Sequence, residues 1–562
     1  MDTIKSEYLR WRQRADASLQ RELAAMGEEE MTNAFFRDLE FGTGGLRGEL
    51  GAGTNRMNLH TVSKASQGLA NYLCEEFPPE QHRVAVSYDS RILSKEFAQT
   101  ASAVFAANGI TVFIYDRLMP TPCLSFAVRA LNCCAGVMVT ASHNPAQYNG
   151  YKVYNADGCQ ITTEAAAQIL AEIEAVDVFD GIRSDDYDSA VASGQIQSVP
   201  ESITDAFIAE VKAQSLLGEE TVDRSAPIVY TPLNGSGREP VLRVLRECGY
   251  KNITLVPEQE MPDGNFPTCP YPNPEVREAL SLAISCAEKT GAELVLATDP
   301  DCDRVGAAVR NGTEYTLISG NEMGLLLLDY ICARRTALGT MPQDPVFVKT
   351  IVTTELAAGI AARHGVRTID VLTGFKFIGE QIGLLEREGR ENSYIFGFEE
   401  SYGYLSGSYV RDKDAVNGAL LICEMFAWHR AHQTSLLNRL EEIYAQVGYC
   451  LNTLHTYSFP GAEGFARMQE LMAHFRKDPP AFGGKRVLEV LDYAPGRDGL
   501  PPSDVLKFVL EDRCSVVVRP SGTEPKLKCY LTVCAADRKA AELWEKRMEE
   551  SVAQFFAPPI TA

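Results

Sequence analysis

The chain has 562 residues, which is too long for one hydrophobic core and suggests about three to five domains. Hydrophobic residues make up 45% of it and charged residues 23%, as in ordinary soluble globular proteins. With 53 Lys and Arg against 75 Asp and Glu, the net charge is −22, which argues against nucleic acid or an anionic membrane as a general partner. Any phosphate site must therefore be built from a local cluster of donors.

The N-terminus does not look like a targeting signal. Its first thirty residues mix Arg with many acidic residues and have no continuous apolar core. The longest apolar stretch, near Met323 to Leu328, is too short to span a bilayer. The 15 cysteines form no metal-type CxxC pairs, so we expect reduced core residues. These features predict a cytoplasmic enzyme.

The predicted elements begin with helices in residues 5–40, where apolar residues recur at helical spacing. Three regions then alternate strand-like runs with helical segments, beginning at RVAVSYD, APIVYTPLNGSG and PVFVKTIVTT. Such alternation predicts parallel or mixed sheets covered by helices. The composition changes after Gln446, which indicates a smaller α+β domain. We expect an α/β protein with domains at 1–205, 206–322, 323–447 and 448–562.

The first candidate motif follows the apolar run Ala135 to Val139, which predicts a buried strand. Ser142 comes at the end of this strand, where open α/β sheets bind ligands, and Asn149-Gly150 predicts a turn further on. His143 could move a proton, and Lys152 could hold an anion. Because neighbouring side chains of an extended segment point opposite ways, Ser142 and His143 are not expected to form a hydrolase-type pair. Taken alone, the motif also fits a structural turn.

The second motif is ATDPDCDRVG, after the strand-like run ELVLA. In an extended loop Asp299, Asp301 and Asp303 project to one side, so they could converge on a hard cation such as Mg²⁺. An EF-hand is excluded, because Arg304 and Arg310 stand where it needs Gly and Glu. Two alternatives stay open, a solvated acidic turn and a haloacid-dehalogenase-type phosphotransferase with Asp299 as its nucleophile.

Two further loops carry polar groups suited to a phosphorylated sugar. In GFEESYGY, Glu399 and Ser401 are two residues apart and could bridge vicinal sugar hydroxyls. In RPSGTEPKLK, Arg519 could donate to phosphate oxygens together with the tight turn formed by Ser521, Gly522 and Thr523. Each loop taken alone also fits a plain hydrogen-bonded turn.

Together the four loops resemble those of the α-D-phosphohexomutase family, the phosphoglucomutase and phosphomannomutase group, over nearly the whole chain. TASHNP resembles the family's phosphoserine loop, DPDCDR its metal loop, GFEES its sugar-recognition loop and RPSGTEP its phosphate-binding loop. FGTGGLRG looks like its N-terminal active-site segment. The resemblance implies three related α/β domains and a smaller fourth around one cleft. Cys302 departs from the small residues common in the metal loop.

The resemblance also implies a role for each matched residue. Ser142 would carry the transferable phosphate, and Asp299, Asp301 and Asp303 would hold Mg²⁺ together with an oxygen of that phosphate. Arg47 would lie near phosphoserine. His143 and Lys152 match positions proposed for proton transfer or charge stabilisation, and the identity of the base stays open. The remaining matched positions would contact the substrate: Arg304, Thr373, Gly374, Lys376, Glu399, Ser401, Arg519, Ser521, Gly522 and Thr523.

The implied reaction moves a phosphoryl group from phosphoserine to a sugar monophosphate and back through a bisphosphate intermediate. GFEESYGY and FGTGGLRG look closest to the long phosphoglucomutase and phosphopentomutase branch. We therefore expect glucose 1-phosphate as substrate and glucose 1,6-bisphosphate as intermediate and activator, with mannose and pentose phosphates as alternatives. A haloacid-dehalogenase-type phosphatase and a non-catalytic sugar-phosphate sensor are remote alternatives. We expect a monomer or a homodimer.

Overall fold

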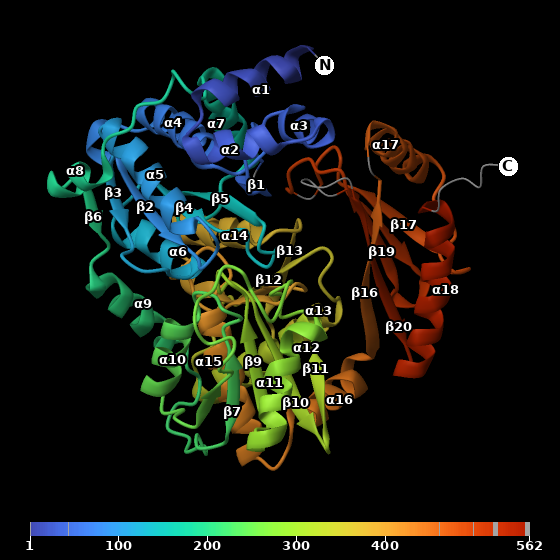
Figure 1. Cartoon of the computed structure of the whole chain (residues 1–562). Coiled ribbons are helices and arrows are strands. Elements are labelled where there is room, and N and C mark those ends of the chain that lie inside the picture. Colours follow the sequence, from blue (N-terminus) through green and yellow to red (C-terminus); the bar gives the residue numbers. More distant parts are fainter. Residues whose placement is uncertain (1, 43, 460, 498, 521–525, 557–562) are drawn as a thin grey trace.

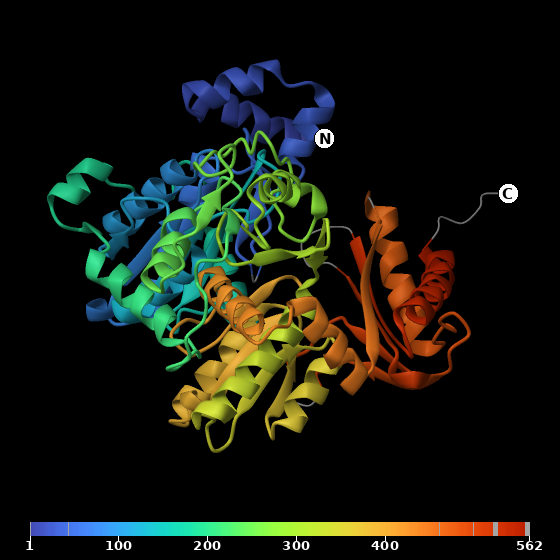
Figure 2. The ribbon, with the colours of Figure 1, turned by 90° about the horizontal axis from the view of Figure 1, so that it is seen from below.

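The computed structural model describes residues 2–42, 44–459, 461–497, 499–520 and 526–556. Within these ranges the chain forms four β-sheets of six, five, four and five strands, with helices packed on them (Figure 1). Both views place the last sheet, in orange and red, beside the other three (Figure 2). The expected α/β fold class is confirmed. In the described part of the chain, no helix combines the length and apolar content that crossing a membrane needs.

The helices expected near the N-terminus are α1 (Asp2–Arg14), α2 (Ala17–Ala25) and α3 (Glu28–Phe35). They pack around the fully buried side chain of Trp11. Arg10 forms an ion pair with Asp177, beyond the helix that covers the first sheet. The N-terminal helices are thus joined to the first sheet through both apolar and charged contacts.

The first sheet has the strand order β1-β5-β4-β2-β3-β6, with β2, β3, β4 and β6 parallel and β1 and β5 antiparallel to their neighbours. Its strands are β1 (Leu46–Glu49), β2 (Arg83–Tyr88), β3 (Thr111–Ile114), β4 (Ala135–Val139), β5 (Tyr148–Asn155) and β6 (Ile196–Ser198). Its helices are α4 (Leu59–Glu76), α5 (Ser94–Ala107), α6 (Thr121–Ala130), α7 (Thr163–Ala175), α8 (Tyr187–Ala192) and α9 (Glu201–Ala213), with the 3₁₀ turn η1 (Pro79–Gln81). All five residues of β4 are buried, as their apolar run predicts.

The turn expected at Asn149-Gly150 is wrong, because both residues lie inside β5. Strand β5 pairs with β1 on one side and with β4 on the other, so tertiary pairing overrides the local turn signal. A Cβ atom at Gly150 would lie 2.5 Å from the carbonyl oxygen of Thr140. Glycine therefore serves here to let the neighbouring chain approach closely.

The second and third sheets repeat the plan of a parallel sheet with an antiparallel edge. The second contains β7 (Ile228–Thr231), β8 (Ile253–Leu255), β9 (Leu294–Thr298), β10 (Val305–Asn311) and β11 (Glu314–Ile318), with helices α10 (Arg238–Glu247) and α11 (Arg277–Thr290). The third contains β12 (Val346–Thr350), β13 (Arg367–Val371), β14 (Tyr394–Glu399) and β15 (Gly403–Leu405). Helices α12 (Gly320–Leu338), α13 (Leu356–Arg363), α14 (Phe375–Arg387) and α15 (Ala415–Ala431) pack with these sheets, α16 (Leu436–Val447) packs on α12 and α13, and η2 (Glu391–Ser393) precedes β14.

All three sheets contain the same connection between consecutive strands, which we call a corner. In each corner, a strand that has a parallel neighbour is followed in the chain by a strand that pairs with it in antiparallel fashion. The pairs are β4 with β5, β9 with β10, and β14 with β15. Ser142 lies in the first corner, the three aspartates lie in the second, and Glu399 with Ser401 lies in the third. The fold therefore places the candidate residues at matching positions of three similar sheets.

The C-terminal sheet is antiparallel throughout, with the order β16-β20-β19-β18-β17. Its elements are β16 (Tyr449–Ser458), β17 (Val487–Asp492), β18 (Leu506–Leu510), β19 (Ser515–Pro520) and β20 (Lys526–Ala535), with helices α17 (Gly461–Lys477) and α18 (Arg538–Phe556) and the turn η3 (Glu511–Arg513). It contacts the third sheet region through Lys507, whose Nζ lies 2.6 Å from Glu355 Oε1.

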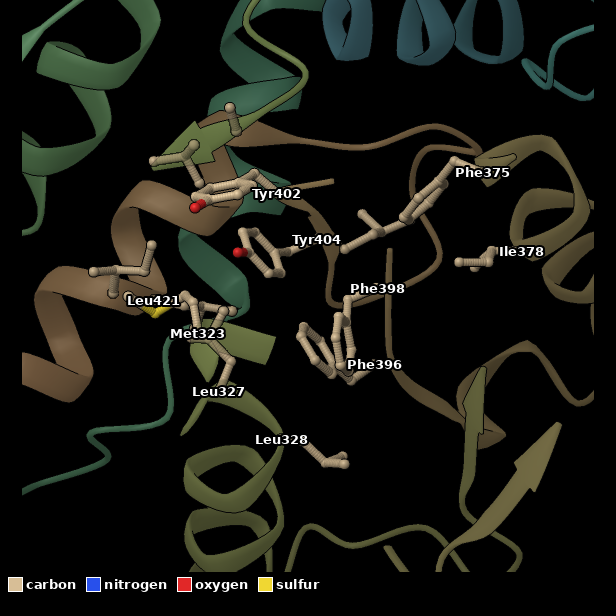
Figure 3. Packing of buried hydrophobic residues seen from close by; sticks show 14 of the residues in the cluster. Met323, Leu327, Leu328, Phe375, Ile378, Phe396, Phe398, Tyr402, Tyr404 and Leu421 are labelled. Atoms are coloured by element: carbon tan, nitrogen blue, oxygen red, sulfur yellow. The ribbon is translucent and has the colours of Figure 1, made fainter. Parts of the chain in front are cut away.

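The core beneath the third corner is shown in Figure 3. Aromatic rings of β14 and β15 pack against α12, and the rings of Phe396 and Phe398 stack with centroids 5.8 Å apart. A Cβ atom at Gly324 of α12 would lie 2.1 Å from the Phe398 ring, so glycine is what lets the helix lie this close. This packing fixes the end of β14, where Glu399 is the last residue.

Candidate active site

Ser142 is buried in the β4–β5 corner with a left-handed φ of 51°. Its N–H donates to Thr140 Oγ1 at 2.8 Å, and its Oγ donates to Asp299 Oδ2 at 2.9 Å. His143 Nδ1 lies 3.3 Å from Ser142 Oγ, so the expectation that the two side chains point apart is wrong. The positive φ breaks the extended geometry on which that expectation rested. The pair still differs from a hydrolase pair, because the hydroxyl hydrogen is directed to Asp299.

Arg91 binds the main chain of the Ser142 loop. Its side chain is fully buried, and its guanidinium group lies over the ring of Phe266, 5.0 Å from the centroid. Its Nη1 donates to the carbonyl oxygens of Pro145 at 2.9 Å and Tyr148 at 3.0 Å. Its Nη2 is in closer contact with the carbonyl oxygens of Ser142 and Asn144. One side chain thus fixes both ends of the loop.

Asp89 supports the same loop through hydrogen bonds. It accepts from Thr140 Oγ1 at 2.6 Å and from Ser94 Oγ at 2.8 Å, and it lies 3.4 Å from Arg91 Nε. Burial raises the pKa of Asp89 and lowers that of Arg91, so each charge depends on the other. Sequence reasoning missed both residues, although charged residues directly after a strand-like run were an available signal.

The three aspartates of the second corner form a compact acidic cluster. Ligand oxygens of Asp299, Asp301 and Asp303 all lie within 4.8 Å of one another, and the side chains are at most 2% exposed. Burial, followed by the other two carboxylates, raises the pKa of Asp299 well above its usual range. One oxygen each of Asp301 and Asp303 is buried without a hydrogen-bond partner among the described residues. A solvated acidic turn does not fit this burial, whereas a hard divalent cation does.

Two lysines neutralise part of this acidic charge. Lys152 Nζ lies 2.7 Å from Asp301 Oδ2, and Lys413 Nζ lies 3.1 Å from Asp303 Oδ2. Burial raises the pKa of Asp301, but the charge and hydrogen bond of Lys152, the hydrogen bond with Asp299 and the charge of Lys413 together outweigh it, and the net shift is downward. Lys413 also pairs with Asp412 at 3.0 Å. Sequence reasoning missed Lys413 and Asp412, and its available signal was the charged run RDKD directly before the apolar segment that forms α15.

Arg47 and Arg304 both lie close enough to the serine loop to act on its charges. Arg47, on β1, has Nη1 3.4 Å from Asn144 Oδ1, and Arg304 forms an ion pair with Glu275. Burial lowers the pKa of His143 well below its usual range, and Arg304 and Arg47 lower it further. The imidazole is therefore neutral at physiological pH.

The sugar-loop candidates meet at the third corner. Glu399 Oε1 accepts from the N–H of Gly374, the residue before α14, at 2.8 Å. Thr373 Oγ1 is buried with no hydrogen-bond partner among the described residues. Burial lowers the pKa of Lys376 to about 8. Ser401 lies in the turn before β15, and no hydrogen bond joins it to the other candidates in the described part of the chain.

Glu400 is a further residue that sequence reasoning missed. Its Oε2 lies 3.3 Å from the hydroxyls of Thr350, the last residue of β12, and of Thr353, which follows that strand. Burial, with a smaller effect of Glu399, raises the pKa of Glu400 to about 7. The sequence shows two adjacent glutamates at a strand end but not that Glu400 packs against two threonine hydroxyls from another strand end.

Arg519 is at the end of β19 in the C-terminal domain. Its Nε is buried without a partner among the described residues, and its charge lowers the pKa values of Lys376 and Glu400 in the third corner. Arg519 therefore lies within electrostatic reach of the sugar-loop candidates. The other candidates of this loop, Ser521, Gly522 and Thr523, are outside the described residues.

Comparison with known proteins gives matches along the chain. Sequence models of phosphoglucomutase/phosphomannomutase match α/β/α domain I over residues 38–178, domain II over 205–312, domain III over 319–447 and the C-terminal domain over 467–550. The chain is 37% identical over 538 residues to a phosphoglucomutase of Staphylococcus saprophyticus, covering 93% of this chain and 96% of that protein.

Solved structures have the same fold. A phosphoglucomutase/phosphomannomutase family protein from Burkholderia thailandensis matches with a TM-score of 0.68 at 18% identity, over 92% of this chain and 97% of that chain. Parafusin, a phosphoglucomutase from Paramecium in its open form, matches with a TM-score of 0.68 at 17% identity, over 93% and 97%.

Proposed function

The chain belongs to the phosphoglucomutase/phosphomannomutase family, and from this premise we propose that it interconverts glucose 1-phosphate and glucose 6-phosphate. It is an isomerase of the phosphohexomutase type. The 37% identical relative is named phosphoglucomutase, which supports glucose over mannose or pentose phosphates. The observation that carries the proposal is the hydrogen bond from Ser142 Oγ to Asp299, because it puts a buried hydroxyl beside a cluster able to hold a cation.

We propose that Ser142 carries the phosphoryl group. Asp299, Asp301 and Asp303, with an oxygen of the phosphorylated serine, would hold Mg²⁺, which supplies charge neutralisation for phosphoryl transfer. The two unpartnered carboxylate oxygens suit such an ion. Arg47 approaches the loop from β1 and supplies a second positive charge for the equatorial oxygens.

Proton movement at the serine is assigned to His143. Its imidazole is neutral and lies 3.3 Å from Ser142 Oγ, so it can accept the hydroxyl proton when the serine attacks a phosphoryl group, and the imidazolium can return that proton in the reverse step. Lys152 is charged and bound to Asp301, which suits charge stabilisation better than proton acceptance. The same reasoning extends to Lys413.

Substrate contacts are proposed on the third corner and the C-terminal domain. Glu399 would accept from sugar hydroxyls, and Ser401 would assist it from the same loop. The other contacts proposed for the sugar and the non-reacting phosphate are Arg304, Thr373, Gly374, Lys376, Arg519, Ser521, Gly522 and Thr523. Because phosphate is transferred at both ends of the sugar, glucose 1,6-bisphosphate would be the intermediate and the activator.

The organisation of the chain is proposed on the same basis. We keep the domain boundaries 1–205, 206–322, 323–447 and 448–562, and we propose a monomer or homodimer working in the cytoplasm. The free, mostly buried cysteines are compatible with that compartment.

Coupled assays test the proposal. Glucose 1-phosphate, mannose 1-phosphate and ribose 1-phosphate are each supplied with catalytic bisphosphate to wild type and Ser142→Ala. Wild type is expected to isomerise glucose 1-phosphate fastest, and the variant is expected to lose at least ~10³-fold, because a covalent phosphate carrier is missing. An active Ser142→Ala enzyme would contradict the mechanism. Phosphate found on Asp299 by mass spectrometry would support the phosphatase alternative instead.

A further inference from the structure

The C-terminal domain holds two cysteines that face each other across neighbouring strands. Cys450 of β16 is paired directly with Cys534 of β20, and their Sγ atoms are 2.7 Å apart. Both are free thiols, and each residue is 5% exposed. Directly opposed residues of antiparallel strands have Cα atoms about 4.5 or 5.5 Å apart. Either separation is within the range of about 4.4–6.8 Å that a disulfide spans.

The surroundings make the two thiols unequal. The pKa of Cys534 is lowered by the Cys450 thiol and by the positive charges of Arg513 and Lys485, although burial opposes the shift. The contact with Cys534 and burial raise the pKa of Cys450. Low-pKa thiols beside cations are the reactive ones, because the thiolate is the nucleophile. Cys534 is therefore the attacking sulfur, and Cys450 is the one placed to resolve.

We propose that Cys450 and Cys534 form a peroxide-sensitive dithiol site, which closes to a disulfide between β16 and β20. The Cys534 thiolate attacks hydrogen peroxide, the O–O bond breaks, and protonation releases water and leaves a sulfenic acid. The Cys450 sulfur then attacks the sulfenic sulfur, so that an S–S bond forms, the S–O bond breaks, and hydroxide leaves with the Cys450 proton as water. In total, two thiols and one peroxide give one disulfide and two waters.

The position of the pair gives the disulfide a structural effect. Strand β16 is at the edge of the sheet, and Cys450 is its second residue, just after the chain leaves α16. The bond would tie this edge strand to its neighbour where the chain enters the domain. It would also link residues 84 positions apart, and long closed loops restrict the unfolded chain most.

A third thiol nearby is less suitably placed. Cys514 Sγ accepts from the main-chain N–H of Cys534 at 3.3 Å and lies 3.6 Å from its carbonyl oxygen. Cys514 thus contacts the backbone of Cys534 rather than its sulfur. This geometry favours Cys450 as the partner.

Peroxide treatment of the full chain, followed by alkylation and non-reducing peptide mapping, tests the proposal independently of mutase activity. The expected product is one cross-linked peptide containing Cys450 and Cys534, two hydrogen atoms lighter and cleaved by dithiothreitol. Exposed Cys74 reports whether the peroxide dose is sufficient. The oxidised protein is also expected to unfold at a higher temperature than the reduced protein.

Two variants make the test specific. Cys529→Ser removes another buried thiol of β20 and is expected to leave the cross-link and the thermal shift unchanged. Cys450→Ser is expected to abolish both and to leave Cys534 as sulfenic or sulfinic acid. Full alkylation of both cysteines at a dose that oxidises Cys74, or a link from Cys534 to Cys514, would overturn the proposal.

Discussion

A serine in the left-handed backbone region needs support from its surroundings, and Arg91 and Asp89 supply it here. Arg91 turns four carbonyl oxygens of the loop toward itself, while Asp89 orients the threonine that binds the Ser142 N–H. The carbonyl oxygens are thereby bound to a positive charge, which would reduce their repulsion of a phosphoryl group carried by Ser142. Neither residue need touch the substrate to govern the reaction.

Arg91→Lys should therefore act on turnover more than on binding. Lysine keeps the charge but has one nitrogen where arginine uses two to reach four carbonyls. We expect kcat to fall about 10- to 100-fold while KM for glucose 1-phosphate stays within about threefold, since small misplacements of a reacting group cost this much. Steady-state kinetics, normalised to the amount of phosphorylated Ser142, measures both constants.

The matched control is Arg129→Lys, because this arginine forms a partly exposed ion pair with Glu386 away from the serine loop. Its kcat and KM should equal those of wild type. An Arg91→Lys enzyme with unchanged kcat would show that the carbonyl contacts do not position Ser142.

Among the elements, α12 and β14 show how tightly the third corner is packed. Gly324 of the helix faces the ring of Phe398, and the next residue of β14 is Glu399. A side chain added to the helix would displace one aromatic ring, and this displacement would reach the sugar-loop glutamate, which follows that ring in the strand.

Gly324→Ala should be destabilising although alanine favours helices. The added Cβ would lie 2.1 Å from Phe398, so helix and strand must separate, which we expect to cost about 1–3 kcal/mol. The control is Gly359→Ala in α13, whose Cβ would have its nearest neighbour at 3.7 Å, and which should be neutral or stabilising by about 0.5–1 kcal/mol. Urea midpoints compare the two, and equal midpoints would refute the steric argument.

Helix α15 begins at a buried aspartate whose ionisation depends on pH. Asp414 accepts from the N–H groups of Val416 and Asn417 and from Tyr409 Oη, and burial raises its pKa to about 6. The pKa of Asp414 in the folded protein exceeds its value in the unfolded chain, near 3.8, so the protonated carboxyl stabilises the folded state. This stabilisation is complete below about pH 4 and is lost as pH rises through 6.

Asp414→Asn should remove this pH dependence while keeping a helix cap. We expect the thermal midpoint of the variant minus that of wild type to be larger at pH 8 than at pH 5. The reason is that only wild type loses the stabilisation by the protonated aspartate over this range. Calorimetry at the two pH values measures it. A constant difference between the two proteins would mean that Asp414 does not titrate in this range.

The elements that the sequence predicted are those whose pattern of apolar residues lies within the element itself. The apolar run of β4 and the periodic helices of residues 5–40 formed as expected, and the family motifs located the three aspartates beside Ser142. Strand β5 was missed because its Asn-Gly pair is held by strands on both sides. Arg91 and Lys413 were missed because the loop carbonyls that Arg91 binds and the Asp303 carboxylate that Lys413 binds are 51 or more residues away, where spacing carries no information.

In the whole molecule, the C-terminal domain is joined to the third by a small, partly buried charge cluster. Glu355 lies 2.6 Å from Lys507 Nζ of β18 and 3.4 Å from Lys349 Nζ of β12. Burial opposes ionisation, yet the two lysines lower the pKa of Glu355. Glu355 is thus a carboxylate of one domain that pairs with lysines of two domains, and we infer that it helps to fix the position of the C-terminal domain.

Lys507→Ala should loosen this contact without unfolding the domain. We expect a larger radius of gyration in small-angle scattering, faster proteolysis near residues 447–449, and a higher KM for glucose 1-phosphate. The control is Lys485→Ala, which removes another buried lysine of the same domain whose partner, Asp512, lies within that domain. If both variants scatter like wild type, Glu355 and Lys507 do not set the domain position.

The two ammonium groups at the acidic cluster also bear on which cations it would hold. Lys152 and Lys413 each bind one oxygen of Asp301 and Asp303, and the other oxygen of each carboxylate has no hydrogen-bond partner among the described residues. A cation bound to those free oxygens would share the two carboxylates with the lysines. Because the lysines already neutralise part of the negative charge, a monovalent ion would be attracted weakly, whereas a divalent ion carries twice the charge for the same contacts. The lysines are therefore expected to favour divalent over monovalent ions.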